Sequence, residues 1–115
     1  MRKRSVICDF GTVAIVPFPF VEQAVTKYRP SVVLSKQAFN DANGQTVLAM
    51  ITTAKETSWA TDIAIEDLEP AGLREPCYVR WKIFTLPNEL IVRAAGRLST
   101  RDWRATRSAL KKAIA

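Results

Sequence analysis

Short apolar segments, separated by polar and turn-forming residues, run through most of this chain of 115 residues. The first segment, Thr12 to Val16, ends where two prolines follow within the run 17–20, which stops a strand. A second segment, Ser31 to Ser35, follows Pro30, and a residue without an N–H suits the first position of a strand. A third segment, Thr46 to Thr52, is nearly all apolar and predicts a central strand covered on both faces.

The later segments alternate between apolar and polar positions, as half-buried strands do. Thr61 to Ile65 predicts one such strand and Cys77 to Phe84 predicts another. In the second, Arg80 and Lys82 fall on the same face, opposite the face of the apolar residues Cys77, Val79, Trp81 and Ile83. The segment Leu90 to Val92 predicts either a last short strand or a helical turn.

The sequence predicts one turn and one helix with specific signals. The cluster Asn40 to Gly44 predicts a turn, and its Asn43-Gly44 pair is typical of a β-hairpin. Ser99 is a good N-cap for a C-terminal helix, and Asp102 completes a capping-box pattern. Its apolar face carries Trp103, Leu110, Ala113 and Ile114, and its cations Arg104, Arg107, Lys111 and Lys112 are expected on a solvated face. Together these elements predict a single domain, 1–115, mainly β with one α-helix, built as a small curved sheet or barrel.

The charge balance favours an acidic partner. Lys and Arg number 17 against 11 Asp and Glu, and the calculated pI is about 9.8. Nucleic acid is the first candidate partner, and the alternative is a basic protein without a polyanionic partner. The chain has no histidine, which excludes a paired-histidine mechanism and removes the commonest zinc ligand.

The cysteines and the hydropathy pattern further limit the class of protein that this chain can be. Cys8 and Cys77 lack metal-ligand spacing, so we expect buried thiols rather than a metal site or a disulfide. The sequence predicts neither a metal nor a cofactor. No apolar run is long enough to span a membrane, so the expected location is the cytoplasm.

Candidate chemistry begins at Arg29. Pro30 biases the preceding residue toward an extended backbone, which would mount Arg29 stiffly, and a guanidinium suits phosphate binding. Lys27 and Tyr28 lie beside it, and the hydroxyls of Thr52 and Thr53 lie where the central strand leaves the core. Taken alone, the two threonines are more typical of an ordinary strand end than of a catalytic site.

Five segments carry a family resemblance because of their order and spacing. They are Gly11 to Phe20, Tyr28 to Ser35, Met50 to Thr53, Ala71-Gly72-Leu73 with Val79-Arg80, and Gly96 to Ser99. In this order they resemble the MazF/PemK family of type II toxin–antitoxin toxins, over nearly the whole chain.

The resemblance implies an SH3-like or CcdB-like β-barrel with a C-terminal helix, usually a homodimer. It implies a metal-independent, sequence-selective endoribonuclease that cleaves single-stranded RNA, leaves a 5′-hydroxyl end and is inhibited by a cognate antitoxin. Arg29 and Thr52 match the residues that act in cleavage. The residues expected to bind RNA around them are Lys27, Tyr28, Thr53, Arg80 and Lys82.

Two departures from the family pattern leave the proton-transfer group open. The stretch Gln23 to Lys27 lacks the acidic or histidine residue that some members carry there, and Lys82 stands where some members have an aspartate. Lys82 with a lowered pKa could transfer the proton, another carboxylate could fold into the site, or the chain could be a weakened RNA-binding homologue. A further alternative is a CcdB-like, non-enzymatic inhibitor of DNA gyrase.

Overall fold

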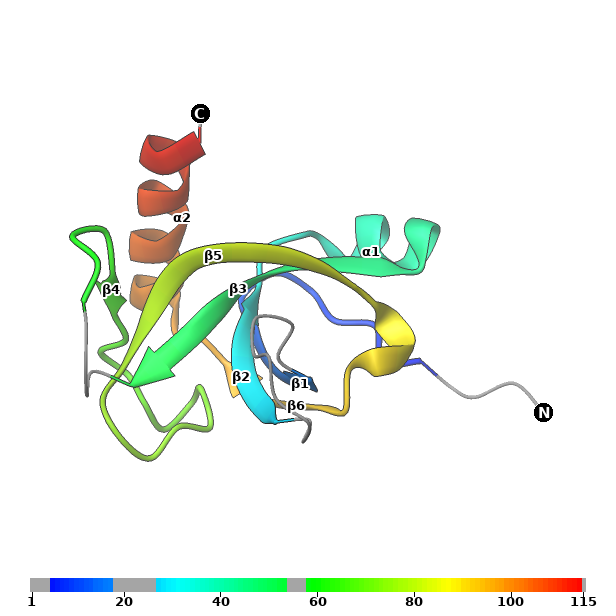
Figure 1. Cartoon of the computed structure of the whole chain (residues 1–115), viewed down its shortest axis with the longest axis horizontal. Coiled ribbons are helices and arrows are strands. Elements are labelled where there is room, and N and C mark those ends of the chain that lie inside the picture. Colours follow the sequence, from blue (N-terminus) through cyan, green and yellow to red (C-terminus); the bar gives the residue numbers. More distant parts are fainter. Residues whose placement is uncertain (1–4, 18–26, 54–57, 115) are drawn as a thin grey trace.

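The fold is a curled, six-stranded antiparallel sheet with a C-terminal helix across one end (Figure 1). We describe it from a computed structural model for residues 5–17, 27–53 and 58–114. The strand order is β4-β5-β3-β2-β1-β6. The strands are β1 (Thr12–Pro17), β2 (Tyr28–Val33), β3 (Gln45–Thr53), β4 (Ile63–Ala64), β5 (Cys77–Pro87) and β6 (Arg93–Arg97). The helical segments are α1 (Gln37–Asn43), the 3-10 turn η1 (Asn88–Leu90) and α2 (Thr100–Ile114). The predicted mainly β fold with a C-terminal helix is confirmed.

Most of the predicted strands are present, with shifted ends. The strand expected over Ser31 to Ser35 begins earlier, at Tyr28, so Arg29 and Pro30 lie inside β2 rather than before it. The alternating segment near residue 63 pairs over only two residues as β4, whereas β5 continues past Phe84 to Pro87. Of the two prolines expected to end the first strand, Pro17 is the last residue of β1. The other, Pro19, is outside the described residues.

The predicted Asn43-Gly44 hairpin turn is wrong. The segment forms helix α1, and Gly44 ends it in the left-handed conformation with φ +64°. A tertiary contact overrides the local turn signal: the buried Asn40 amide donates to the carbonyls of Cys8 and Ser35, at 2.9 and 3.2 Å. Asn88 of η1 donates in turn to the Asn40 carbonyl at 2.7 Å, so the short helix is held by its buried amide.

Two apolar clusters cover the two faces of the sheet. One gathers Val13, Val32, Ala49, Ile51 and Val79 with Leu98, and Trp103 of α2 packs against it. The other joins Ala14, Val16, Val33 and Leu48 to Cys8 and Ile91. Strand β3 contributes to both clusters, which confirms the prediction of a central strand. Both cysteines are buried and free, as predicted.

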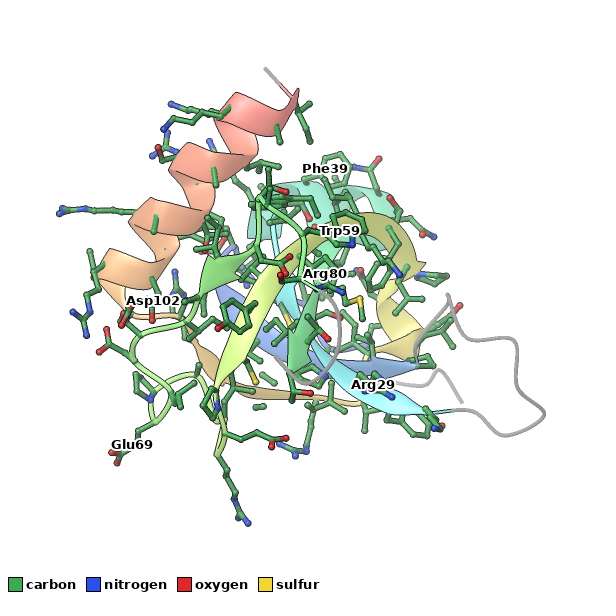
Figure 2. The ribbon with its side chains drawn as sticks, turned by 60° about the vertical axis from the view of Figure 1, so that its left-hand side comes forward. Arg29, Phe39, Trp59, Glu69, Arg80 and Asp102 are labelled. Atoms are coloured by element: carbon green, nitrogen blue, oxygen red, sulfur yellow. The ribbon has the colours of Figure 1, made fainter. Side chains whose placement is uncertain are left out.

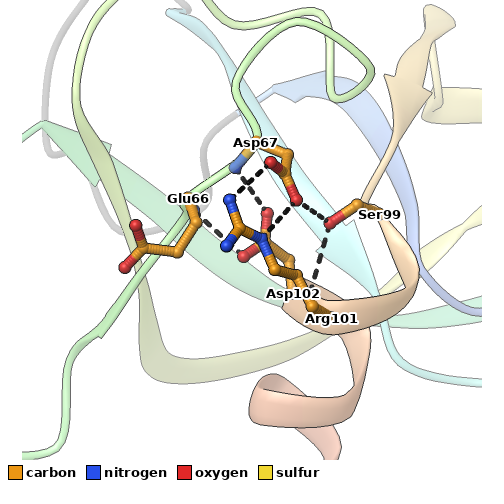
Figure 3. Close-up of polar contacts among 5 residues, drawn as sticks. All are labelled: Glu66, Asp67, Ser99, Arg101 and Asp102. Atoms are coloured by element: carbon orange, nitrogen blue, oxygen red, sulfur yellow. Dashed lines mark hydrogen bonds and ion pairs between the residues drawn. The ribbon is translucent and has the colours of Figure 1, made fainter.

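Helix α2 has the N-cap that the sequence predicts, but Asp102 makes other hydrogen bonds than the predicted ones. The Ser99 hydroxyl accepts from the Asp102 N–H at 3.3 Å, which is the expected N-cap. The buried Asp102 carboxylate does not complete a capping box: it accepts the backbone N–H groups of Glu66 and Asp67, at 3.0 and 2.9 Å (Figure 3). The helix start is therefore tied to the loop after β4. Within the described residues, no helix is long and apolar enough to cross a membrane.

Asp67 links the same loop to α2 through a second set of contacts. Its carboxylate accepts from the Ser99 hydroxyl at 2.5 Å and from two nitrogens of Arg101 at 2.8 Å (Figure 3). Hydrogen bonds from Arg101 and then Ser99 lower the pKa of Asp67 to about 2. A depressed carboxyl pKa stabilises the fold at neutral pH, and this contribution disappears as pH falls from about 4 toward 2.

We expect Asp102→Ala to lower the free energy of unfolding by about 2–4 kcal/mol, because two N–H groups near the core lose their acceptor. The matched control is Arg101→Ala, which breaks the solvent-exposed pair with Asp67 and should cost clearly less than Asp102→Ala. Urea denaturation of both variants measures the difference. Equal losses would show that the buried carboxylate has no special role.

Candidate functional site

A cleft of about 670 Å³ opens where β2 and β3 separate. Pairing between these strands stops at Ser31 and Met50, and the residues beyond this point line the two sides. The walls are completed by the loop that leads into β5. The lining residues are Lys27, Tyr28, Arg29, Pro30, Ile51, Thr52, Thr53, Leu73, Arg74, Glu75 and Cys77. Among the described residues, three cations and one carboxylate line the cleft, so it suits an anionic ligand.

Arg29 and Thr52 lie on one face of the sheet at the cleft. Ser31 pairs with Met50, the last pair between β2 and β3, and Arg29 and Thr52 each lie two residues beyond it. Alternation along each strand then puts these two side chains on one face of the sheet. Arg29 is exposed and Thr52 is half-buried at the cleft. The Thr52 hydroxyl donates to the Thr53 carbonyl at 3.4 Å, a long bond that a better acceptor could replace.

The loop before β5 is held against β6, and this contact positions one wall of the cleft. Gly72 adopts φ +73°, and a Cβ there would lie 2.3 Å from the carbonyl oxygen of Ala95. The Arg97 N–H donates to the carbonyl of Pro70 at 2.8 Å, which fixes the two segments side by side. The residues that follow Gly72, up to Glu75, project from this anchored turn into the cleft lining.

The sequence did not point to Glu75 as a candidate site residue. Among the described residues that line the cleft, it carries the only carboxylate. It also lies close enough to Cys77 for its charge to add to burial in raising the pKa of that thiol. Its loop position gave no periodic signal, and only the fold brings it to the same cleft as Arg29.

Arg80 lies on the same face of the sheet but outside the cleft lining. It pairs with Met50, so it shares a face with Thr52 on the adjacent strand. Its guanidinium is buried in a two-point contact with Asp62, from Nε at 3.1 Å and from Nη2 at 2.8 Å. The hydrogen bond from Arg80 lowers the pKa of Asp62, and the same bond raises that of Arg80. The ion pair fixes the direction of this cation.

A bulge in β5 follows Arg80. Met50 pairs with Arg80 but the preceding residue, Ala49, pairs with Ile83, so Trp81 and Lys82 are extra residues on β5. Two extra residues preserve the alternation, so Arg80 and Lys82 still approach one common neighbour, the Trp59 ring. The distances from its centroid are 5.3 Å to Arg80 Cζ and 5.9 Å to Lys82 Nζ. Figure 2 shows Trp59 next to Arg80, with Arg29 further along the same side.

The structure thus divides the predicted site residues into two groups. The cleft gathers Lys27, Tyr28, Arg29, Thr52 and Thr53. Arg80 and Lys82 form a second cationic group on β5, against Trp59. Lys82, which stands where some family members have an aspartate, is not among the residues that line the cleft. The loop stretch Gln23 to Thr26 is outside the described residues.

The comparisons with known proteins agree on one family. Residues 9–114 match the profile of the PemK-like, MazF-like toxins of type II toxin–antitoxin systems. The chain belongs to this family. A search of curated protein sequences found no match.

Solved structures of this family share the fold at low sequence identity. An endoribonuclease bound to its cognate antitoxin, from a mycobacterial species, superposes with a TM-score of 0.73 at 19% identity, over 94% of this chain and 93% of that one. MazF from Deinococcus radiodurans gives a TM-score of 0.73 at 15% identity, over 95% and 97%. The toxin MazF-mt6 of Mycobacterium tuberculosis gives 0.71 at 22% identity, over 90% and 95%. The SH3-like or CcdB-like barrel expected from sequence is here the MazF-like form of a curled, half-barrel sheet.

Proposed function

We propose that this chain is a metal-independent endoribonuclease toxin that cleaves single-stranded RNA in the cleft between β2 and β3. The observation that carries the proposal is that Arg29 and Thr52, on one face of the sheet, both line a cleft whose described charged residues are three cations and one carboxylate. Family membership supports the same activity, since a mycobacterial relative of this fold is an endoribonuclease.

The cleft suits attack by a ribose 2′-oxygen on the adjacent phosphorus. This step forms the bond from the 2′-oxygen to phosphorus and breaks the bond from phosphorus to the 5′-oxygen. The 2′-hydroxyl proton passes to a base, and the departing 5′-oxygen gains a proton. The products are a 2′,3′-cyclic phosphate and a 5′-hydroxyl end, so atoms and charge balance without an added co-reactant.

Arg29 holds a non-bridging phosphate oxygen in this scheme, because negative charge grows there in the transition state. An arginine guanidinium keeps its proton in proteins, which favours charge stabilisation over proton transfer. The Thr52 hydroxyl donates to the phosphate or orients the 2′-hydroxyl, and Thr53, Lys27 and Tyr28 bind the flanking RNA. A guanidinium supplies the positive charge that a metal ion would otherwise provide, which is why we expect no metal requirement.

We assign Glu75 as the general base that accepts the 2′-hydroxyl proton. It is the carboxylate of the described cleft lining, and general bases in such reactions are carboxylates or imidazoles within reach of the substrate. The chain has no histidine to compete for this role. This assignment takes the second of the three sequence alternatives, a carboxylate that folds into the site, over proton transfer by Lys82.

Incubation of the purified protein with single-stranded RNA of varied sequence, in the presence of a chelator, tests the proposal. We expect cleavage at a restricted set of sites, and 5′ ends that polynucleotide kinase labels without prior phosphatase treatment. Intact RNA would contradict the proposal. Intact RNA together with inhibition of gyrase supercoiling would assign the chain to the non-enzymatic class instead.

We further propose two protein partners. A cognate antitoxin would cover the cationic cleft, as family members of this fold have been solved in complexes with antitoxins. A second copy of the chain would form a homodimer. Co-expression with the product of an adjacent small reading frame should restore growth of cells that express this chain, and light scattering should give twice the monomer mass.

A further inference from the structure

We propose that Trp59 is a stacking platform for a nucleobase of the RNA, on the same face of the sheet as Arg29 and Thr52. The inference rests on the proposed ribonuclease function and extends it to a second subsite outside the cleft. Neither the family match nor the sequence pattern pointed to this residue.

The Trp59 ring is exposed, although two cationic side chains of β5 lie close to it. Trp59 as a residue is 41% exposed, while Arg80 Cζ and Lys82 Nζ lie 5.3 and 5.9 Å from the ring centroid. Both cations come from β5, so the indole lies over that strand. A large exposed aromatic ring backed by cations is typical of surfaces that bind single-stranded nucleic acid, where bases stack and cations contact the backbone.

Asp62 makes this platform rigid. Its carboxylate accepts from the Trp59 backbone N–H at 2.9 Å and from two nitrogens of Arg80. The Asp62 N–H donates back to the Trp59 carbonyl at 3.0 Å, which closes the turn on itself. The Asp62–Arg80 pair is almost fully buried, with side-chain exposures of 6% and 9%. A ring held in place before binding loses less entropy when a base stacks on it.

The position of the platform fits a nucleotide next to the cleaved phosphate. Arg80 pairs with Met50, and Met50 and Thr52 project to the same face of β3, two residues apart. An RNA strand with its phosphate between Arg29 and Thr52 can therefore continue along this face toward β5. Lys82 is placed to meet a backbone phosphate there, and the Trp59 ring to meet the base.

The test compares binding of an RNA that the protein cannot cleave. The probe is a fluorescein-labelled, random-sequence, fully 2′-O-methylated single-stranded oligonucleotide, which lacks the attacking hydroxyl. Trp59→Ala should weaken binding about tenfold or more, and Trp59→Phe should restore most of it because a phenyl ring still stacks. Phe39→Ala is the matched control: Phe39 is an aromatic residue of 46% exposure on α1, at the other end of the sheet (Figure 1), and its loss should leave binding unchanged.

Intrinsic fluorescence gives a readout that does not depend on the stability of the alanine variant. Binding of the unlabelled probe should quench the tryptophan emission of the wild type, and Trp59→Phe should bind but lose that quenching. Equal binding by wild type and Trp59→Ala, or quenching that persists in Trp59→Phe, overturns the platform while leaving the ribonuclease proposal intact. A wild type that neither binds this probe nor cleaves RNA overturns both.

Discussion

Arg29→Ala should slow RNA cleavage by about 100-fold or more. Removing one preorganised donor from a group on which charge develops typically costs two to three orders of magnitude in rate. In this protein the loss should not fall below that range, because we assign no metal ion to share the charge. Single-turnover cleavage of a mapped RNA site, with protein in excess, measures the effect on the chemical step.

Two control variants separate this role from general electrostatics. Arg29→Lys keeps the charge but loses the planar, two-point geometry, so it should recover only a small part of the rate. Arg104→Ala removes the same charge from the exposed face of α2 and should change the rate less than about twofold, in keeping with weak, screened effects of distant charges. A loss in Arg104→Ala as large as that in Arg29→Ala would mean that net charge, not the cleft, controls cleavage.

Gly72→Ala should lower the free energy of unfolding by about 2–5 kcal/mol. A side chain at φ +73° is strained, and its Cβ would lie 2.3 Å from the Ala95 carbonyl oxygen, which is backbone and has no rotamer to move to. Strain and overpacking of this kind cost about 1–2 and 1–3 kcal/mol respectively. Urea denaturation measures the loss, and cleavage should fall with it because the same loop carries Glu75 into the cleft.

Gly44→Ala is the matched control for Gly72. Gly44 also has a positive φ, of +64°, but nothing lies within 4 Å of its Cβ position. Only the conformational strain remains, so we expect a loss of about 1–2 kcal/mol and unchanged cleavage. If the two variants lose equal stability, the packing of the loop against Ala95 is not what holds this wall of the cleft.

The central strands could be predicted from sequence because their apolar runs match what a buried strand requires. The predictions that failed concern elements whose conformation depends on tertiary contacts. Asn43-Gly44 is a strong local hairpin signal, but the buried Asn40 amide finds its partners only if the segment is helical. Strand β6, Arg93–Arg97, was not expected because it is an edge strand with mostly exposed side chains and a glycine.

In the candidate site, too, some residues are marked by the sequence and others are brought into place only by the fold. Arg29 and Thr52 could be chosen from the sequence because they match the family motifs, and both line the cleft. Glu75 and Trp59 lie in loops, where no periodicity indicates a direction, and Asp62 lies in the alternating segment Thr61 to Ile65 but outside β4. Each reaches its place through a long-range contact: the loop packing at Gly72 for Glu75, and the ion pair with Arg80 for the other two.

The most direct test of the central claim is a map of RNA 5′-hydroxyl ends in bacteria that express the wild type or Arg29→Ala at matched levels. The cleft assignment predicts that new 5′-hydroxyl ends accumulate at a recurring short sequence in cells with the wild type and are absent with Arg29→Ala. The same ends in both strains, or growth arrest by the wild type without new ends, would contradict cleavage of RNA at Arg29.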